Sequence, residues 1–250
     1  MRYEVDVIIL AENTTSSAKI VSTLNTYSSV SYEYAPVLGC RKLELFTRFP
    51  SNRLNTVLED ERLTARLLVL PRAVQSILLV ALHFPSKTYM DEEDQTALVP
   101  IYVDLVNQAE KAIGHQRSLL IGDFNMNPYE RGLVSATGFN GVMSRAIADK
   151  GSRTVQGREW SFFYNPMWGL FGDRTPGPPG TYYYAGTGPA SYYWHIFDQV
   201  LIRPALYQLC GNIDVEILDS DGHAQFLLPN GAPNTKVYSD HLPLLVRIEI

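Results

Sequence analysis

The most constraining feature of this 250-residue chain is a series of short apolar runs, rich in β-branched residues, that end abruptly in polar residues. Runs of this length and composition are typical of buried β-strands. The polar residues at or near the strand ends are Glu12, His83, Asp123, Asn125, Asp198, Asp240 and His241. One carboxylate at a strand end is usually only a turn former. The recurrence of such residues predicts that several strand ends bring acids and imidazoles to one edge of a sheet.

Asp198 differs from the others because it lies inside the apolar segment "IFDQVLI". Burying a carboxylate is costly unless the group is paired. The sequence therefore predicts a hydrogen-bond partner for Asp198, and a histidine is a good candidate.

The other segments predict a packed α/β domain. Continuous strands are expected at 5–12, 75–87 and 118–125, and helices at 13–27 and 91–115, the second despite Pro100. The segments 41–49 and 62–70 alternate polar and apolar residues and are expected to be half-buried strands. Two late strands are expected at 195–204 and 241–250. We interpret residues 1–250 as a single domain with a long Gly-, Pro- and Tyr-rich loop at about 152–194.

Composition excludes several classes of protein. The chain is 46% hydrophobic and 19% charged, as in soluble globular proteins. No apolar run approaches the roughly 18 residues of a membrane span, and no leader opens the chain. Two cysteines, Cys40 and Cys210, are interpreted as buried thiols of a cytoplasmic protein, with one disulfide as the alternative. A net charge of −5 argues against a large nonspecific phosphate-binding surface.

The polar set suits the hydrolysis of a phosphate ester. An anionic substrate calls for a divalent cation, which carboxylates such as Glu12 can hold. Asp123 is suited to orient and deprotonate water. Asn125 and His241 can donate to the nonbridging oxygens as charge develops, and an Asp–His pair would fix the imidazole.

The order of these motifs resembles the endonuclease/exonuclease/phosphatase superfamily. "LLIGDFNMNP" is similar to its Gly-Asp-Phe-Asn signature and "SDHLPLL" to its closing Ser-Asp-His motif. The resemblance implies a deoxyribonuclease I-like fold, a four-layered α/β sandwich with two packed mixed β-sheets flanked by helices. It also implies Mg²⁺, with Mn²⁺ as a substitute, at the metal-site residues Glu12 and Asp240. The implied catalytic residues are His83, Asp123, Asn125, Asp198 and His241.

The sequence departs from the family pattern in two places. The family usually begins with a strand that carries a metal-site asparagine, and only eleven residues precede Glu12 here. We expect either a sequence truncated at its start or a site built differently. Around Asp198 the segment "WHIFDQ" supplies His195 and Gln199 in place of the usual Arg or its equivalent. These changes keep a catalytically degenerate binding or scaffold protein among the alternatives.

The aromatic stretch before Asp198 bears on the substrate. Its rings can stack on unpaired bases, with arginines nearby for phosphates; alternatively, Trp160, Phe162 and Trp168 pack a small core under the loop. The expected substrate-binding residues are Asn127, Arg153, Arg158, Arg174 and His195. We interpret the chain as a metal-dependent phosphodiesterase, a nuclease with DNA or RNA as its partner. The alternative is a phosphatase or phosphodiesterase of small phosphorylated metabolites or lipids. The oligomeric state stays open.

Overall fold

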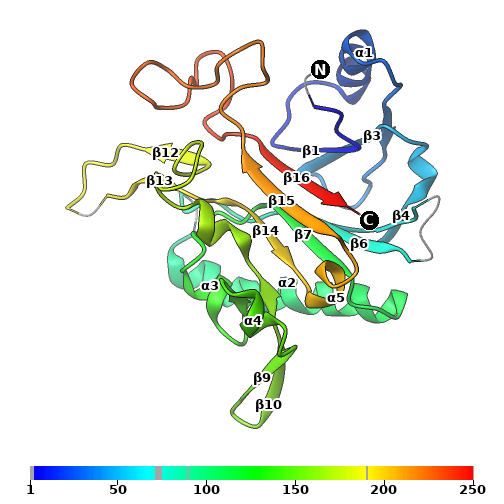
Figure 1. Cartoon of the computed structure of the whole chain (residues 1–250), viewed down its shortest axis with the longest axis vertical. Helices are drawn as coiled ribbons and strands as arrows, with labels where there is room; N and C mark the ends of the chain where they lie inside the picture. Colours follow the sequence, from blue (N-terminus) through cyan, green and yellow to red (C-terminus); the bar gives the residue numbers. More distant parts are fainter. Residues whose placement is uncertain (1–2, 71–74, 89, 190, 250) are drawn as a thin grey trace.

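A seven-stranded mixed sheet forms the centre of the molecule (Figure 1). The computed structural model describes residues 3–70, 75–88, 90–189 and 191–249. In spatial order the strands are β4 (Leu54–Asp60), β5 (Leu63–Leu68), β6 (Ile77–His83), β7 (Ser118–Asp123), β14 (Asp198–Ile202), β11 (Phe163–Tyr164) and β8 (Gly141–Val142). Only the β6–β7 and β11–β8 pairs are parallel, and the other neighbours are antiparallel.

Helix α2 (Glu92–Ile113) covers one face of this sheet. Its apolar side, with Val99, Val106 and Ala109, shares a core with residues of β5, β6, β7 and β14. The Asp91 side chain accepts a hydrogen bond from the N–H of Asp94 at 2.8 Å and caps the first turn. The helix continues through Pro100 and ends at Gly114, whose φ of 74° is left-handed. The helix expected at 91–115 is thereby confirmed.

The other face packs on a second layer of strands. Here β1 (Val7–Ala11), β3 (Leu43–Thr47) and β2 (Glu33–Ala35) form one antiparallel ladder, while β15 (Asn212–Ile217) and β16 (Leu244–Glu249) form another. The sequence correctly predicted a layered α/β fold with a large mixed sheet and helices. The second layer, however, is divided into two antiparallel ladders.

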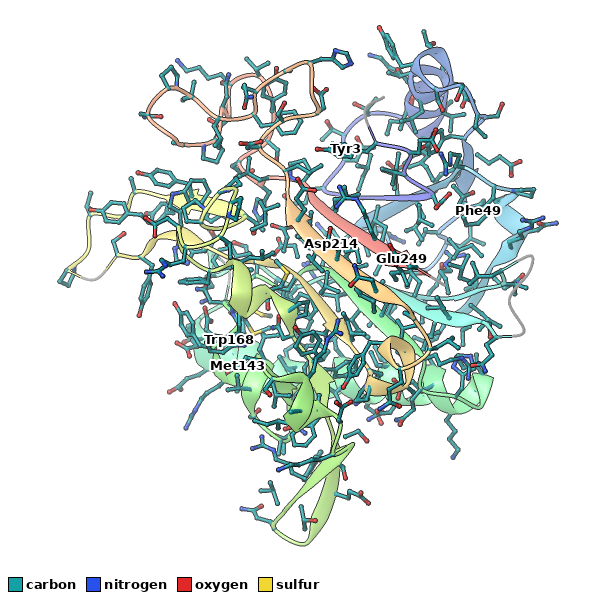
Figure 2. The ribbon with its side chains drawn as sticks, in the orientation of Figure 1. Tyr3, Phe49, Met143, Trp168, Asp214 and Glu249 are labelled. Carbon is teal, nitrogen blue, oxygen red and sulfur yellow. The ribbon has the colours of Figure 1, made fainter. Side chains whose placement is uncertain are left out.

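Helix α1 (Ser17–Tyr27) and a pair of ion pairs lie on the two ladders of the second layer. The helix lies beyond the first ladder, where the Ser17 hydroxyl donates to Glu44 of β3 at 2.5 Å. On the second ladder Arg247 of β16 lies 2.7 Å from both Asp214 and Glu216 of β15 (Asp214 is labelled in Figure 2). The layers are therefore α2, the seven-stranded sheet and the two ladders, with α1 at the outside of the first ladder.

The segments 41–49 and 62–70 contain strands β3 and β5, as expected, but the expected alternation of buried and exposed residues is wrong within these strands. In β5 Thr64 and Arg66 are buried along with Leu63 and Ala65, and β3 is mainly buried too. Arg66 is tolerated there because its guanidinium pairs with Glu59 of β4 and donates to Thr64 Oγ1 at 2.7 Å. The polar residues that alternate with apolar ones in β5 therefore form a buried polar network and do not face solvent.

The Gly-, Pro- and Tyr-rich stretch contains regular structure. It forms a β9–β10 hairpin (Ser152–Val155 and Arg158–Ser161), strand β11, the 3₁₀ helix η2 (Pro166–Leu170) and a β12–β13 hairpin (Tyr182–Tyr184 and Tyr193–His195). Figure 1 shows the β9–β10 hairpin projecting from the body, well away from β12–β13. The remaining short helices are η1 (Ser51–Arg53), α3 (Arg131–Val134), α4 (Arg145–Ala148) and α5 (Pro204–Tyr207).

Two predictions from composition can be compared with the structure. Within the described residues, the helices are all too short or too polar to cross a bilayer. Cys40 is buried and Cys210 is half-buried, and both are free thiols. The predicted thiols are thus present, although only one of them is fully buried.

Candidate active site

Sheet register brings three of the predicted residues into one row. His83 at the end of β6 is the register partner of Asp123 at the end of β7. Asp123 is in turn the partner of Asp198 at the start of β14. Because neighbouring strands are about 4.8 Å apart, residues in register across three strands lie side by side. The row forms where β6 and β7 end and the antiparallel β14 begins.

Asp123 is held rigidly within this row. Its Oδ1 accepts the backbone N–H of Asn125 at 2.7 Å, and its Oδ2 accepts the Asn125 side-chain amide at 2.8 Å. The same amide nitrogen also donates to the carbonyl of Phe84 at 2.9 Å. Asn125 has a left-handed φ of 49°, which turns the chain back toward the carboxylate. The Asn125 amide thus orients Asp123, and both of its N–H donors are engaged.

Burial raises the pKa of Asp123, and the neighbouring charge of Asp198 raises it further, while His241 opposes both effects. An ordinary aspartate is a weak base at neutral pH because its pKa lies near 4. A raised pKa brings the group closer to the value that suits a general base. The environment therefore favours proton transfer at Asp123.

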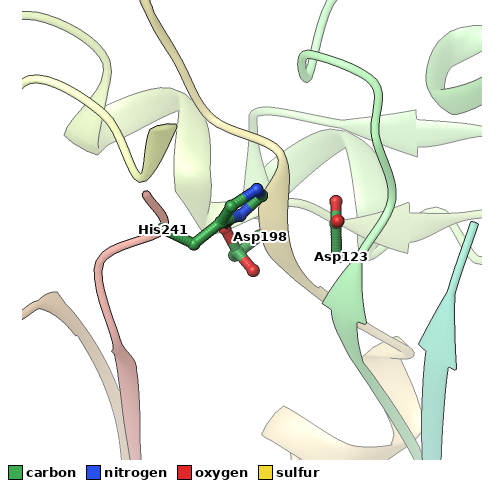
Figure 3. A group of neighbouring side chains, drawn as sticks. All are labelled: Asp123, Asp198 and His241. Carbon is green, nitrogen blue, oxygen red and sulfur yellow. Dashed lines mark hydrogen bonds and ion pairs between the residues drawn. The ribbon is translucent and has the colours of Figure 1, made fainter. Parts of the chain in front are cut away.

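The expected partner of Asp198 is His241, whose Nδ1 lies 2.7 Å from Asp198 Oδ2. Figure 3 shows the imidazole beside Asp198, with Asp123 on the adjacent strand. Burial disfavours the imidazolium, but Asp198, Asp123 and Asp240 outweigh burial and raise the pKa of His241 to about 9. The geometry keeps His241 protonated at neutral pH and leaves its Nε2 as a donor.

His83 occupies the other end of the row. Its Nε2 lies 3.5 Å from Glu12 Oε1 and 3.6 Å from Asp123 Oδ2, so it separates two carboxylates. Burial lowers the pKa of His83, with the opposing charge of Glu12 a smaller influence. Glu12 follows β1 with a left-handed φ of 53°, and its carboxylate is 70% exposed. Glu12 therefore reaches the row from the second layer of strands.

The two predicted metal ligands are associated with different histidines of the site. Glu12 approaches His83, whereas Asp240 is exposed and contributes to the electrostatic environment of His241. The described residues also include a group with ligand atoms all within 4.8 Å of one another, namely Asp123, Asp198 and His241. Much of that group's hydrogen-bonding capacity is already used internally, by the Asp198–His241 and Asp123–Asn125 bonds.

Asn127 and His195, both predicted to bind substrate, contact each other. The buried Asn127 amide nitrogen lies 3.0 Å from His195 Nδ1 and 2.9 Å from Glu130 Oε1, and its oxygen accepts the N–H of Ile196 at 3.0 Å. Asn127 is thus fully engaged and positions His195. If Asn127 donates to Nδ1, the His195 proton resides on Nε2.

The three predicted arginines do not gather at the row. Arg153 and Arg158 belong to the β9–β10 hairpin, and Arg153 donates to the carbonyl of Val134 at 3.0 Å. That hairpin points away from the β12–β13 hairpin (Figure 1). Arg174 is exposed in the loop between η2 and β12. Gln199, the departure from the family pattern, is buried and bonds Asn165 at 2.8 Å and Ile196 at 3.1 Å.

Sequence reasoning missed residues that complete the site. The buried Thr181 hydroxyl accepts the N–H groups of Phe197 and Asp198, both at 3.1 Å. The Tyr182 ring lies 4.8 Å from the His241 ring, measured between centroids. Lys87 pairs with Glu130 and lies 5.7 Å from the Phe197 ring centroid. The only available signals were the position of "TYYY" before Asp198 and of Lys87 shortly after His83.

Known structures share the fold of this chain. No family model and no curated protein matches the sequence. Truncated TDP2 from Caenorhabditis elegans is 14% identical, with a TM-score of 0.52 over 98% of this chain and 84% of that one. TDP2 from D. rerio, solved with a single strand DNA product, is also 14% identical, with a TM-score of 0.52 over 98% of this chain and 86% of that one.

A third similar structure is the endonuclease domain of TRAS1, a telomere-specific non-LTR retrotransposon. It is 13% identical, with a TM-score of 0.50 over 98% of this chain and 99% of that one. Likeness at this level of identity concerns the fold and leaves the chemistry to the residues.

Proposed function

We propose that this chain, which has a deoxyribonuclease I-like fold, is a metal-dependent phosphodiester hydrolase of the endonuclease/exonuclease/phosphatase superfamily, a nuclease of DNA or RNA. The observation that carries the proposal is the row of His83, Asp123 and Asp198, completed by the His241–Asp198 bond of 2.7 Å. The row combines a carboxylate of raised pKa with a protonated imidazole, which are the base and the donor that phosphodiester hydrolysis needs.

Asp123 is the proposed base. It orients a water for attack on phosphorus and takes its proton, with Asn125 as the positioning residue that fixes both carboxylate oxygens. The burial that raises the pKa of Asp123 supports this role. In the sequence-based assignment Asn125 contacts phosphate directly. With its two N–H donors engaged, Asn125 acts through Asp123 instead.

His241 is the proposed donor to a nonbridging phosphate oxygen. The developing charge of the transition state is stabilised most by a donor that is already charged and oriented. Asp198 orients the His241 ring by accepting a hydrogen bond from Nδ1, and its negative charge keeps the ring protonated. His83, a neutral imidazole between Glu12 and Asp123, lies close enough to contact the same phosphate group.

We propose Glu12 and Asp240 as ligands of a divalent cation, Mg²⁺ or Mn²⁺ in its place. The residues fit such an ion because carboxylate oxygens are the hard donors that it prefers. Glu12 is mainly exposed and lies 3.5 Å from His83, so its oxygens are accessible. When bound, the ion supplies positive charge to the phosphate, which the acids Glu12, Asp123 and Asp198 would otherwise repel.

Cleavage assays test the function. Supercoiled plasmid and single-stranded oligonucleotides are incubated with Mg²⁺, beside an EDTA control, for the wild type, Asp123→Asn and a surface control, Asp104→Asn on α2. We expect metal-dependent cleavage that falls by at least about 100-fold in Asp123→Asn and is unchanged in Asp104→Asn. A folded wild type that cleaves neither nucleic acid nor a small phosphodiester would contradict the proposal.

Metal binding is measured separately by isothermal titration calorimetry with Mg²⁺ and Mn²⁺. Removing one carboxylate ligand weakens the site, so Glu12→Gln should bind either ion at least about tenfold more weakly. Glu93→Gln, which changes an exposed acid in the first turn of α2, serves as the matched control. Binding that is unchanged in Glu12→Gln would place the ion elsewhere, with the Asp123, Asp198 and His241 group as the next position to test.

A further inference from the structure

A continuous series of aromatic side chains leads outward from His241. We name this series the aromatic path; from the site outward its rings are Tyr182, Phe197, His195, Tyr192, Tyr129 and Phe171. Successive ring centroids, starting from His241, are 4.8, 5.2, 4.8, 6.1, 5.9 and 6.0 Å apart. Trp168 on η2, labelled in Figure 2, lies beside the outer end, 6.4 Å from Tyr129.

Three parts of the chain build the path. The first is the loop that follows β7, the second is the segment at the end of η2, and the third is the β12–β13 hairpin with the residues just after it. The hairpin lies beside the strand ends that carry the active-site row (Figure 1). The register pair of Tyr182 and His195 fixes two of the rings across the hairpin. The path is therefore continuous with the proposed catalytic site and anchored to it.

The outer rings are not core residues. Tyr192 is 64% exposed, and Tyr129 and Phe171 are each 37% exposed. Phe84 and Phe124, which pack under α2, are fully buried instead. Contiguous exposed rings beside a polar site mark a surface that binds a partner. The alternative interpretation was that Trp160, Phe162 and Trp168 only pack a small core. Phe162 is buried, but Trp160 and Trp168 are half-buried, and a small core does not account for the exposed rings.

The charges near the path favour bases over phosphates as its main contact. Lys87, which lies 5.7 Å from the Phe197 ring centroid, is already paired with Glu130. Arg153 and Arg158 project away on the β9–β10 hairpin. Duplex binding depends on many cations that neutralise phosphates, and the bases of a duplex are already stacked on one another. Single strands present free base faces, which aromatic side chains stack on without regard to sequence.

Resting on the proposed nuclease function, we infer that the aromatic path binds the unpaired bases of a single-stranded nucleic acid next to the phosphate that is cleaved. The bases lie on the exposed faces of Tyr192, Tyr129 and Phe171. Asn127 holds His195 through Nδ1. The free Nε2 of His195 then contacts the nucleic acid between these rings and His241. The substrate class is thereby narrowed from nucleic acid in general to single strands or single-stranded ends.

Fluorescence anisotropy in EDTA measures binding without cleavage. The probes are a labelled 12-nucleotide single strand, the same strand in duplex form, and a strand of equal length and charge in which the central nucleotides are abasic. The proteins are the wild type, Tyr192→Ala, Tyr192→Phe and the control Tyr27→Ala on α1. Thermal denaturation verifies that each variant is folded.

We expect the single strand to bind at least about tenfold more tightly than the duplex or the abasic strand. Tyr192→Ala should weaken single-strand binding by roughly 5- to 150-fold, the loss of one base–ring stack, while Tyr192→Phe and Tyr27→Ala should not. Equal binding of the normal and abasic strands, or tighter binding of the duplex, would overturn the inference. So would binding to anionic phospholipid vesicles without binding to the strand.

Hydrolysis of methyl p-nitrophenyl phosphate, a diester without a base, separates the two proposals. If the wild type hydrolyses it with Mg²⁺ but does not prefer single strands, the aromatic path is wrong and the hydrolase function stands. If the wild type prefers single strands but cleaves no diester, the hydrolase function is wrong and the path remains a binding site.

Discussion

A side chain at residue 122 would collide with the neighbouring strand. Gly122 has a φ of 149°, and a Cβ built there would lie 1.9 Å from the carbonyl oxygen of Leu82. Glycine is thus required one residue before Asp123, where β6 and β7 come together at the candidate active site. We expect Gly122→Ala to be destabilised by about 3 kcal/mol or more, which lowers the melting temperature by roughly 6–12 °C.

Differential scanning calorimetry measures this change, with Gly169→Ala as the control. Gly169 has no atom within 4 Å of a built Cβ, so its substitution should shift the melting temperature little. Similar melting temperatures for both variants would show that β6 and β7 can separate without cost. That result would contradict the close approach of Gly122 to the carbonyl of Leu82.

The Asp198–His241 bond makes a prediction about pH. In metal-free protein the pKa of His241 is about 9, because the nearby carboxylates outweigh burial. In Asp198→Asn it should fall toward the ordinary value near 6.5, since burial disfavours the imidazolium and only Asp123 and Asp240 then oppose burial. NMR titration of the imidazole protons follows this change, and a pKa that stays near 9 in the variant would contradict the pairing.

The same shift has a consequence for stability. A histidine whose folded pKa exceeds its unfolded pKa stabilises the protein most below about pH 6.5 and loses this contribution as pH rises toward 9. The contribution is about 3 kcal/mol at most, because each pKa unit corresponds to about 1.4 kcal/mol. Asp198→Asn should therefore be less stable than the wild type at pH 6 and closer to it at pH 9.

The sequence predicted residue types at the site better than their contacts. An acid inside an apolar strand requires a partner, so the pairing of Asp198 could be foreseen, and His241 fills that place. The donors of Asn125 and Asn127 are used within the protein, which no spacing in the sequence reveals. The predicted arginines are close to the aromatic stretch in sequence, yet the β9–β10 hairpin carries Arg153 and Arg158 away from it in space.

At the scale of elements, continuous apolar runs were predictable and short polar strands were not. Strands β6 and β7 are buried on both sides, so their composition identifies them. Strand β4, with the sequence LNTVLED, lies at an edge of the sheet and pairs its Glu59 with Arg66 of β5. Residues of β4 form a strand because they pair with β5, not because they are hydrophobic. Such pairing between segments cannot be detected from the residue pattern of one segment.

Strand β1 has an open edge with a testable consequence. The opposite edge of β1 pairs with β3. At its two ends the N–H of Glu12 donates to the carbonyl of Lys42, and the N–H of Arg48 donates to the carbonyl of Asp6. Because backbone groups alternate along an antiparallel strand, the N–H groups of Ile8 and Leu10 also face β3. The N–H of Ile9 therefore points to the edge that no strand of the described residues pairs with.

We expect the amide of Ile9 to exchange with solvent at least about tenfold faster than those of Ile8 and Leu10, because an unpaired N–H needs no opening of the ladder. Hydrogen exchange followed by NMR compares the three amides within one strand, so each serves as a control for the others. Equal protection of all three would mean that another segment or chain covers the edge.

The whole molecule carries a net charge of −5, which limits how it can hold an anionic polymer. Few cations lie near the aromatic path, since Lys87 is paired and only Arg174 is exposed in the adjoining loop. For single strands the slope of log affinity against log salt concentration is about −0.7 for each neutralised phosphate. With one or two phosphates engaged, the slope should be about −1, so the affinity should fall only about eightfold between 50 and 400 mM salt.

Anisotropy titrations of the single strand between 50 and 400 mM NaCl measure this slope, with Lys87→Gln as the charge variant. If Lys87 contacts a phosphate, the variant should flatten the slope, whereas Tyr192→Ala should weaken binding at every salt concentration without changing it. A slope steeper than about −3 would require four or more phosphate contacts. Binding would then be driven by a basic surface, and stacking on the aromatic path would be secondary.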